Sequence, residues 1–220
     1  MSSPVIQLLV LAAIAIFLII RLRDVLGTRE GFEKPAVTKT ADPRDEKRGQ
    51  FQVIEGGPDA DITDHVPDGS PAAKALTAMK AAEPSFNVGE FLGGARGAYE
   101  MILMAFEAGD LAKIRPFLAD DVYESFAAVV EARAEKGLTI EADFVGLREL
   151  KLLDAEFDPA TNEGEVTVRF LGELTSVVRD KSGEIVEGNP KEVKRQKDVW
   201  TFGRIMGSDN PNWLLVATGG

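Results

Sequence analysis

Residues 88–108 read VGEFLGGARGAYEMILMAFEA, and this stretch decides the fold because its large apolar residues recur with the spacing of a helix. Gly93, Gly94 and Gly97 interrupt the pattern, and each glycine inside a helix costs about 1 kcal/mol relative to alanine. We therefore expect a long helix with one apolar face, and another element that packs closely against it at the glycines. The expected apolar face consists of Phe91, Leu92, Ala95, Tyr99, Ile102, Leu103 and Phe106.

The residues after this helix change from helical to strand-like spacing. A short helix is expected over residues 111–118 and a third one from Asp120 to Gly137, where glycine is favoured at a helix end. Beyond it, runs rich in β-branched and aromatic residues alternate with turn sequences such as 161–164. Helices followed by an antiparallel meander predict an α+β fold, with the helices covering one face of a four-stranded sheet. The expected strands are residues 139–157, 165–178, 192–204 and 213–218.

The chain begins with an apolar run, Val5–Ile20, in which only Gln7 is polar and which Arg21-Leu22-Arg23 closes. With its flanking residues, the run approaches the roughly 17 to 20 residues that a helix needs to cross a bilayer. A cleaved secretory signal is the competing interpretation, but no basic residue precedes the run and no small-residue cleavage site follows it. We therefore predict a single transmembrane helix within residues 1–23.

The charges beside the apolar run predict its orientation. Basic residues follow the run within about 20 positions, and positively charged flanks stay on the cytoplasmic side of a membrane. We expect a single-pass protein with a short N-terminus outside and the rest of the chain in the cytoplasm. The basic residues are Arg21, Arg23, Arg29, Lys34 and Lys39.

Composition divides the rest of the chain. Residues 24–69 are rich in charged residues, proline and glycine, and they hold too few large apolar side chains to offset the entropy of ordering, so we expect a flexible linker. Ser70-Pro71 begins a short helix over residues 70–83, since serine is a favoured cap and proline fits the first turn. Pro84 ends this helix, and residues 84–220 are expected to form the folded α+β domain, which is long enough to bury a core.

Composition also limits the function. The formal net charge is −11, so nucleic acid is not expected as a partner, because nucleic-acid-binding surfaces are basic. There is no cysteine and only one histidine, His65, which excludes disulfides, thiolate metal sites and a two-histidine metal site. Acidic pairs such as Asp120-Asp121 and Glu131/Glu135 fit a helix cap and a solvated helix face. We expect no enzyme activity, no metal and no cofactor.

Two stretches resemble a known family. Residues 84–133, PSFNVGEFLGGARGAYEMILMAFEAGDLAKIRPFLADDVYESFAAVVEAR, and residues 197–218, KDVWTFGRIMGSDNPNWLLVAT, are similar to the beginning and the end of the Tim44-like domain. The resemblance implies helices packed on a curved antiparallel sheet, in the cone-like nuclear-transport-factor-type fold, with an apolar pocket between them. It also implies non-enzymatic work in protein translocation. The anchor and linker are similar to those of alphaproteobacterial TimA-type adaptors, which implies the bacterial inner (cytoplasmic) membrane.

This sequence departs from the family pattern in two ways. The mitochondrial import-motor tether has a long basic segment that engages chaperone and translocase, whereas residues 24–69 are short and of mixed charge. The domain is also acidic, which weakens the case that it lies on anionic lipid.

The candidate binding residues follow from the expected pocket. Arg96 and Arg204 are basic residues among apolar neighbours, and each is expected to pair with a carboxylate, Asp198 or Glu100 in the case of Arg204. For every apolar candidate, ordinary core packing is the alternative. The apolar candidates are Phe91, Tyr99, Leu103, Trp200, Phe202 and Trp213.

Three functions stay open at this point. The leading hypothesis is a membrane-anchored adaptor or tether, whose partner is a membrane protein complex, a chaperone or a translocating polypeptide. The second is an accessory subunit of a larger inner-membrane complex, in which the apolar helix itself recognises a neighbour. The third is a binder of lipid or of another small apolar ligand, which would use the same pocket.

Overall fold

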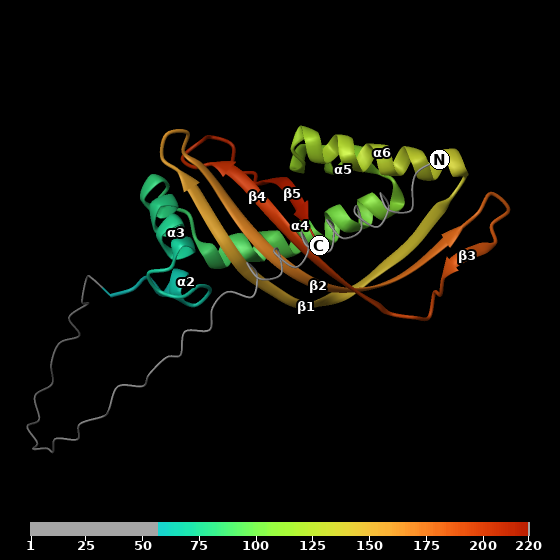
Figure 1. Cartoon of the computed structure of the whole chain (residues 1–220), viewed down its shortest axis with the longest axis horizontal. Coiled ribbons are helices and arrows are strands. Elements are labelled where there is room, and N and C mark those ends of the chain that lie inside the picture. The colour runs from blue at the N-terminus through green and yellow to red at the C-terminus, as the bar shows by residue number, and fades with distance from the viewer. Residues whose placement is uncertain (1–56, 220) are drawn as a thin grey trace, which may run out of the picture. The chain divides into compact units, whose positions relative to one another are not determined.

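The computed structural model describes residues 57–219, which form helices packed against one antiparallel sheet (Figure 1). This arrangement confirms the expected α+β class. The predicted transmembrane helix and residues 24–56 of the predicted linker lie outside the described residues. Within the described part, no helix is long and apolar enough to cross a bilayer.

The helices and strands follow each other in the order that the sequence predicts, except that α2 and β3 were not predicted. The helices are α2 (Ala60–Thr63), α3 (Pro71–Ala82), α4 (Val88–Ala108), α5 (Leu111–Ile114), the 3₁₀ helix η1 (Arg115–Phe117) and α6 (Asp120–Lys136). The strands are β1 (Thr139–Asp158), β2 (Glu163–Arg179), β3 (Ile185–Gly188), β4 (Lys194–Ile205) and β5 (Leu214–Gly219).

The sheet has five strands, so the prediction of four is wrong by one. The main strand order is β1-β2-β4-β5, and all neighbouring pairs are antiparallel. The additional strand is β3, whose four residues pair with Val177–Arg179 at the end of β2. Four residues are too few to show an alternating pattern of their own, so the sequence did not distinguish this strand from a short extension.

The sheet is curved, as the family resemblance implies (Figure 1). The curvature has a local cause in β1, which changes register against β2 at three places along its length. Each change marks a β-bulge, which bends the strand and increases its twist. The shifts lie between Phe144 and Gly146, between Leu147 and Glu149, and between Leu152 and Asp154.

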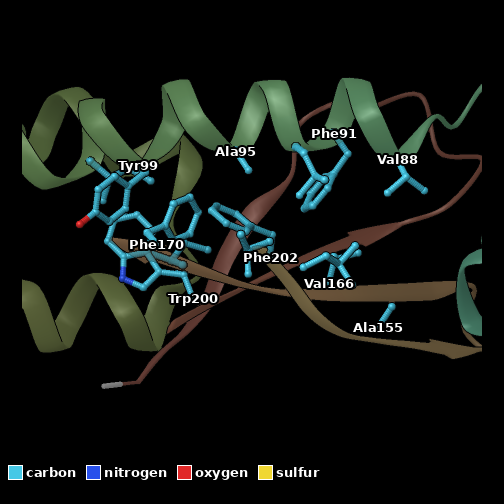
Figure 2. Close-up of a cluster of buried hydrophobic side chains, with 14 of the residues drawn as sticks. Val88, Phe91, Ala95, Tyr99, Ala155, Val166, Phe170, Trp200 and Phe202 are labelled. Carbon is cyan, nitrogen blue, oxygen red and sulfur yellow. The ribbon is translucent and has the colours of Figure 1, made fainter. Parts of the chain in front are cut away.

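Helix α4 forms as predicted and packs its apolar face on the sheet (Figure 2). The Asn87 side chain caps its first turn by accepting a hydrogen bond from the Glu90 N–H at 2.8 Å, and Gly109 ends it with a φ of 75°. The Tyr99 and Phe170 rings are stacked with centroids 4.4 Å apart. The buried α4 residues are Val88, Phe91, Leu92, Ala95, Tyr99, Ile102, Leu103 and Ala105, and the core of the sheet includes Val166, Val168, Phe170, Trp200 and Phe202.

The glycines of α4 do not serve a close contact within the domain. Gly93, Gly94 and Gly97 are exposed, and a Cβ built on any of them would meet no other atom within 4 Å. The prediction that an element packs against them is therefore wrong for residues 57–219. A close approach occurs instead at Gly172 of β2, where a Cβ would lie 2.8 Å from the Tyr99 hydroxyl.

The folded unit begins earlier than the sequence predicts. Residues 57–69 were expected to belong to the flexible linker, but Ile62 and Val66 are buried, with 3% and 6% of their surface exposed. The Asp61 carboxylate accepts hydrogen bonds from the N–H groups of Val88, at 2.8 Å, and Gly89, at 3.0 Å, at the start of α4. The composition of residues 57–69 is otherwise typical of a linker, so Ile62, Val66 and Asp61 alone did not predict a folded segment.

Helix α3 also belongs to this unit rather than preceding it. Its N-terminus has the predicted cap, because the Ser70 hydroxyl accepts a hydrogen bond from the Ala73 N–H at 3.1 Å and Pro71 occupies the first turn. Leu76 and Met79 are fully buried in the common core.

We expect Asp61→Ala to lower the free energy of unfolding by about 1 to 2 kcal/mol, because it removes a side-chain cap from the first turn of α4. It also removes one of the two carboxylates that Lys80 Nζ contacts at 2.7 Å, and Asp59 remains. Urea unfolding of residues 57–220, followed by tryptophan fluorescence, measures the change. The exposed neighbour Asp64, as Asp64→Ala, is the control and should change the free energy by less than about 0.5 kcal/mol. Equal effects of the two substitutions would contradict the capping role.

Candidate functional site

A pocket of about 350 Å³ opens where the first turns of α4 meet β4 and the segment before β5. Its walls are mainly aromatic. The centroids of the Phe91 and Trp213 rings are 4.7 Å apart. The Phe86 ring lies 5.8 Å from Trp213, and the Phe202 ring lies 6.0 Å from Phe91. Small residues complete the wall on the helix side, and polar residues surround the opening. The small residues are Gly94, Ala95 and Ala98, and the polar ones include Glu83, Glu90, Arg204 and Asn212.

Four of the eight candidate binding residues line this pocket. They are Phe91, Phe202, Trp213 and Arg204. The other four do not. Tyr99, Leu103 and Trp200 are core residues, 0%, 4% and 4% exposed, and Arg96 is exposed on α4 without lining the pocket.

Arg204 is held in the pocket wall by groups from two sides. Its Nη2 is paired with the Glu83 carboxylate at the end of α3, and its Nη1 donates to the Pro211 carbonyl at 3.1 Å. The expected partners Asp198 and Glu100 are therefore wrong. The guanidinium carbon also lies 5.5 Å from the centroid of the Trp213 ring, which is a cation–π distance.

Glu83 connects the end of α3 with the end of β4 and the turn that follows it. Besides Arg204, its carboxylate accepts the Gly207 N–H at 2.8 Å, after the end of β4. The hydrogen bond from Arg204 holds the pKa of Glu83 below its usual value, because the bond favours the charged carboxylate. The Arg204 side chain is 10% exposed and that of Glu83 is 19% exposed, so this ion pair is largely withdrawn from water.

Asp198 forms a second polar contact, at the edge of the core rather than in the pocket. It accepts a hydrogen bond from the Tyr99 hydroxyl at 2.6 Å and one from the Gln196 amide at 3.2 Å. Burial, together with the bond to Asp198, raises the pKa of Tyr99, so this hydroxyl stays protonated. The contact fixes α4 to β4 and does not line the pocket.

The side chains that line the pocket are suited to binding another molecule. Its aromatic walls suit a large apolar group, and the guanidinium edge and carboxylates at the opening suit polar groups beside it. Among residues 57–219, no group of three acidic or histidine side chains is arranged to hold a metal ion.

Sequence reasoning missed several residues of the pocket. Phe86 directly precedes the Asn87 cap, a position at which an apolar residue often packs back on the helix, and this signal was available. Glu83 carried no such signal, because its partner Arg204 is 121 positions away in the chain. Gly94 and Ala98 line the pocket because of where they lie on α4, although neither belongs to its apolar face.

The chain is similar to one protein family and to parts of two known proteins. The Tim44-like domain family matches residues 72–220. The human mitochondrial import inner membrane translocase subunit TIM44 is 25% identical over 148 residues, which are 66% of this chain and 32% of that protein. This chain thus spans about a third of the length of that relative. The intermembrane space region of the chloroplast protein ARC6 aligns with 60% of this chain and 92% of its own, at 12% identity and a TM-score of 0.37.

Proposed function

This chain belongs to the Tim44-like domain family, and we propose that it is a membrane-anchored, non-enzymatic adaptor that holds polypeptide partners of a protein-translocation machinery at the membrane. The relative's name supports the setting, since that protein is a subunit of an inner-membrane translocase. In this proposal Val5–Ile20 is the anchor, and the domain works in the cytoplasm at the bacterial inner membrane, as in TimA-type adaptors.

The pocket between α4, β4 and β5 is the observation that carries this proposal. Its walls present the half-buried Trp213 ring and the remaining accessible part of Phe91, which is 7% exposed, to a cavity of about 350 Å³. Exposed apolar surface in a concave site is typical of a place where another molecule binds. In the proposed function that molecule is a polypeptide, and the pocket receives its side chains.

A second candidate function uses the same pocket for a lipid chain or another small apolar ligand. The volume and the aromatic walls favour it, because they suit a slender apolar group as well as a side chain. The accessory-subunit hypothesis concerns the anchor instead, since there the apolar helix itself would recognise a neighbour.

The adaptor proposal predicts protein crosslinks from the pocket in intact membranes. With p-benzoylphenylalanine in place of Trp213, irradiation is expected to give discrete protein adducts, which mass spectrometry identifies. The same probe at Val186, which is 55% exposed on β3 and outside the pocket, is the control and should not give these adducts. Adducts of lipid alone would favour the ligand-binding function, and the absence of any adduct specific to the pocket would refute both.

Scrambling the order of residues 5–20 at constant composition separates the adaptor from the accessory subunit. A pure anchor tolerates the scramble, because membrane insertion depends on hydrophobicity rather than on order. The crosslinks from position 213 and the recovery of the chain in the membrane fraction should then be unchanged. If the chain stays in the membrane but the crosslinks disappear, the helix itself recognises the partner complex.

A further inference from the structure

Helix α4 carries a second row of small and apolar residues on the side that does not face the sheet. Gly94, Gly97, Met101, Met104 and Ala108 follow each other at alternating spacings of three and four, which is the spacing of residues in the seam between two packed helices. We call these five residues the outer seam. Its glycines and Ala108 are exposed, and its methionines are half-buried and pack in part against the core.

The glycines of the outer seam have no explanation within the described part of the chain. Glycine in a helix interior is destabilising relative to alanine, yet a Cβ at Gly94 or Gly97 would meet nothing within 4 Å. Small residues at this spacing allow a second helix to approach the backbone closely. Methionines suit such a surface as well, because their flexible side chains adapt to different partners.

The outer seam is continuous with the pocket. Gly94 belongs to both, and Ala98, one turn further along α4, also lines the pocket. The opposite wall holds Arg204, whose side chain is nine-tenths buried and whose Nε finds no acceptor within residues 57–219. A buried donor without an acceptor is uncommon in a finished domain, and it points to an acceptor supplied by a bound molecule.

The charges along the outer seam indicate the partner's charge. Glu90, at the rim of the pocket, and Glu100 are exposed on α4, and neither has an ion-pair partner among the described residues. Arg96 is the single basic residue of α4. A partner with basic residues beside its apolar row therefore complements this surface.

We propose that the outer seam of α4 binds an α-helical segment of a partner polypeptide, which inserts one tyrosine side chain into the pocket, so that its ring meets the aromatic walls and its hydroxyl oxygen accepts from Arg204 Nε, and sets basic side chains beside Glu90 and Glu100. The glycines let the two helices approach at one end of the seam, and the methionines adapt to the partner at the other. This inference deepens the proposed function, because it rests on a polypeptide partner and specifies its form.

A binding assay with defined peptides tests the inference. The probe is a fluorescein-labelled, alanine-based peptide of about 20 residues, long enough to be helical in water, with leucines at spacings of three and four, one tyrosine and flanking lysines. It is titrated with the full chain in lipid nanodiscs, and its anisotropy is compared with that on empty nanodiscs. Matched peptides carry a central proline, alanine for the tyrosine, or glutamate for the lysines.

Binding should be saturable, and each of the three changed peptides should bind at least about tenfold more weakly, since each loses the helix, the side chain in the pocket or the complementary charge. Met101→Glu in the chain should weaken binding of the original peptide at least as much, because it sets a charge in the apolar seam.

Gly94→Ala with Gly97→Ala is the most discriminating variant, because stability and binding should change in opposite directions. The two alanines should raise Tm by roughly 4 to 8 °C, as helix propensity predicts, while the added methyl groups weaken peptide binding several-fold. Ser125→Ala, on an exposed position of α6, is the control and should leave binding unchanged.

The inference is overturned if the alanine variant is stabilised but binds the peptide as before, or if no peptide binds more than empty nanodiscs do. A dimer of the full chain that Met101→Glu dissociates would show that the seam binds a second copy instead. The peptide assay and the crosslinking experiment can give opposite outcomes, so they test the helical partner and the adaptor function separately. Protein crosslinks from position 213 with no effect of the seam variants would leave the adaptor function intact and reject the helical partner.

Discussion

Tyr99→Ala is expected to lower the free energy of unfolding by about 4 kcal/mol, the largest effect of any single substitution that we predict. Tyr99 is fully buried, and its ring contacts three others, with centroids 4.4 Å from Phe170, 4.9 Å from Trp200 and 6.1 Å from Phe144. Truncation removes these contacts and leaves a cavity between helix and sheet, which neighbouring rings fill only partly. Urea unfolding of residues 57–220 measures the loss.

Tyr99→Phe separates the ring from the hydroxyl. The phenylalanine keeps the stacking but leaves Asp198 without the donor at 2.6 Å, so we expect a loss of roughly 1.5 to 3 kcal/mol, as for hydrogen bonds to charged groups. Tyr123→Ala on α6 is the control, because that ring is only half-buried, and it should cost clearly less than Tyr99→Ala. A Tyr99→Ala loss below about 2 kcal/mol would contradict the view that this stack joins α4 to the sheet.

The position of Tyr99 also explains why the sheet holds a glycine opposite it. The Gly172 Cβ that alanine would add lies 2.8 Å from the hydroxyl, so a larger residue there would push α4 away from β2. The hydroxyl, the glycine and the carboxylate of Asp198 thus set the distance between helix and sheet. That distance determines the position of the two turns of α4 that precede Tyr99, and these turns form one wall of the pocket.

The sequence predicts those parts of the fold in which the spacing of residues within a single helix or strand shows which side chains are buried. The apolar face of α4 recurs every three or four residues, and the Gly109 and Gly137 helix ends have the left-handed backbone that favours glycine. Both features are local, so they appear in the sequence without knowledge of the partner elements. The first part of the domain, α2 and the residues beside it, was missed because its contacts are made by isolated residues such as Ile62 and Asp61.

The candidate site was predictable only in part, for a related reason. Phe91 and Tyr99 lie on the same apolar face of α4, two turns apart, yet one lines the pocket and the other is completely enclosed. The difference comes from Trp213 and the segment before β5, which stop short of filling the space beside Phe91. Such a gap depends on how elements that are far apart in the sequence pack together, so the spacing of residues along the chain does not predict it.

Glu83→Ala is expected to have the second largest effect, a loss of about 3 kcal/mol in the free energy of unfolding near neutral pH. The substitution leaves the largely buried guanidinium of Arg204 without its carboxylate, and an uncompensated buried charge is strongly destabilising. It also removes the acceptor of the Gly207 N–H. Glu90→Ala, at the exposed rim of the same pocket, is the matched control and should change stability by less than about 0.5 kcal/mol.

The pH dependence of this loss identifies its electrostatic origin. Arg204 holds the pKa of Glu83 in the folded domain below 4.5, the value of an unperturbed glutamate, so the unfolded chain takes up a proton first as the pH falls. The stabilising contribution of Glu83 is therefore complete above about pH 5 and is lost as the pH falls through the folded pKa. The difference in unfolding free energy between the native chain and Glu83→Ala should shrink accordingly in acid, whereas a difference that is constant with pH would mean that Glu83 acts through packing alone.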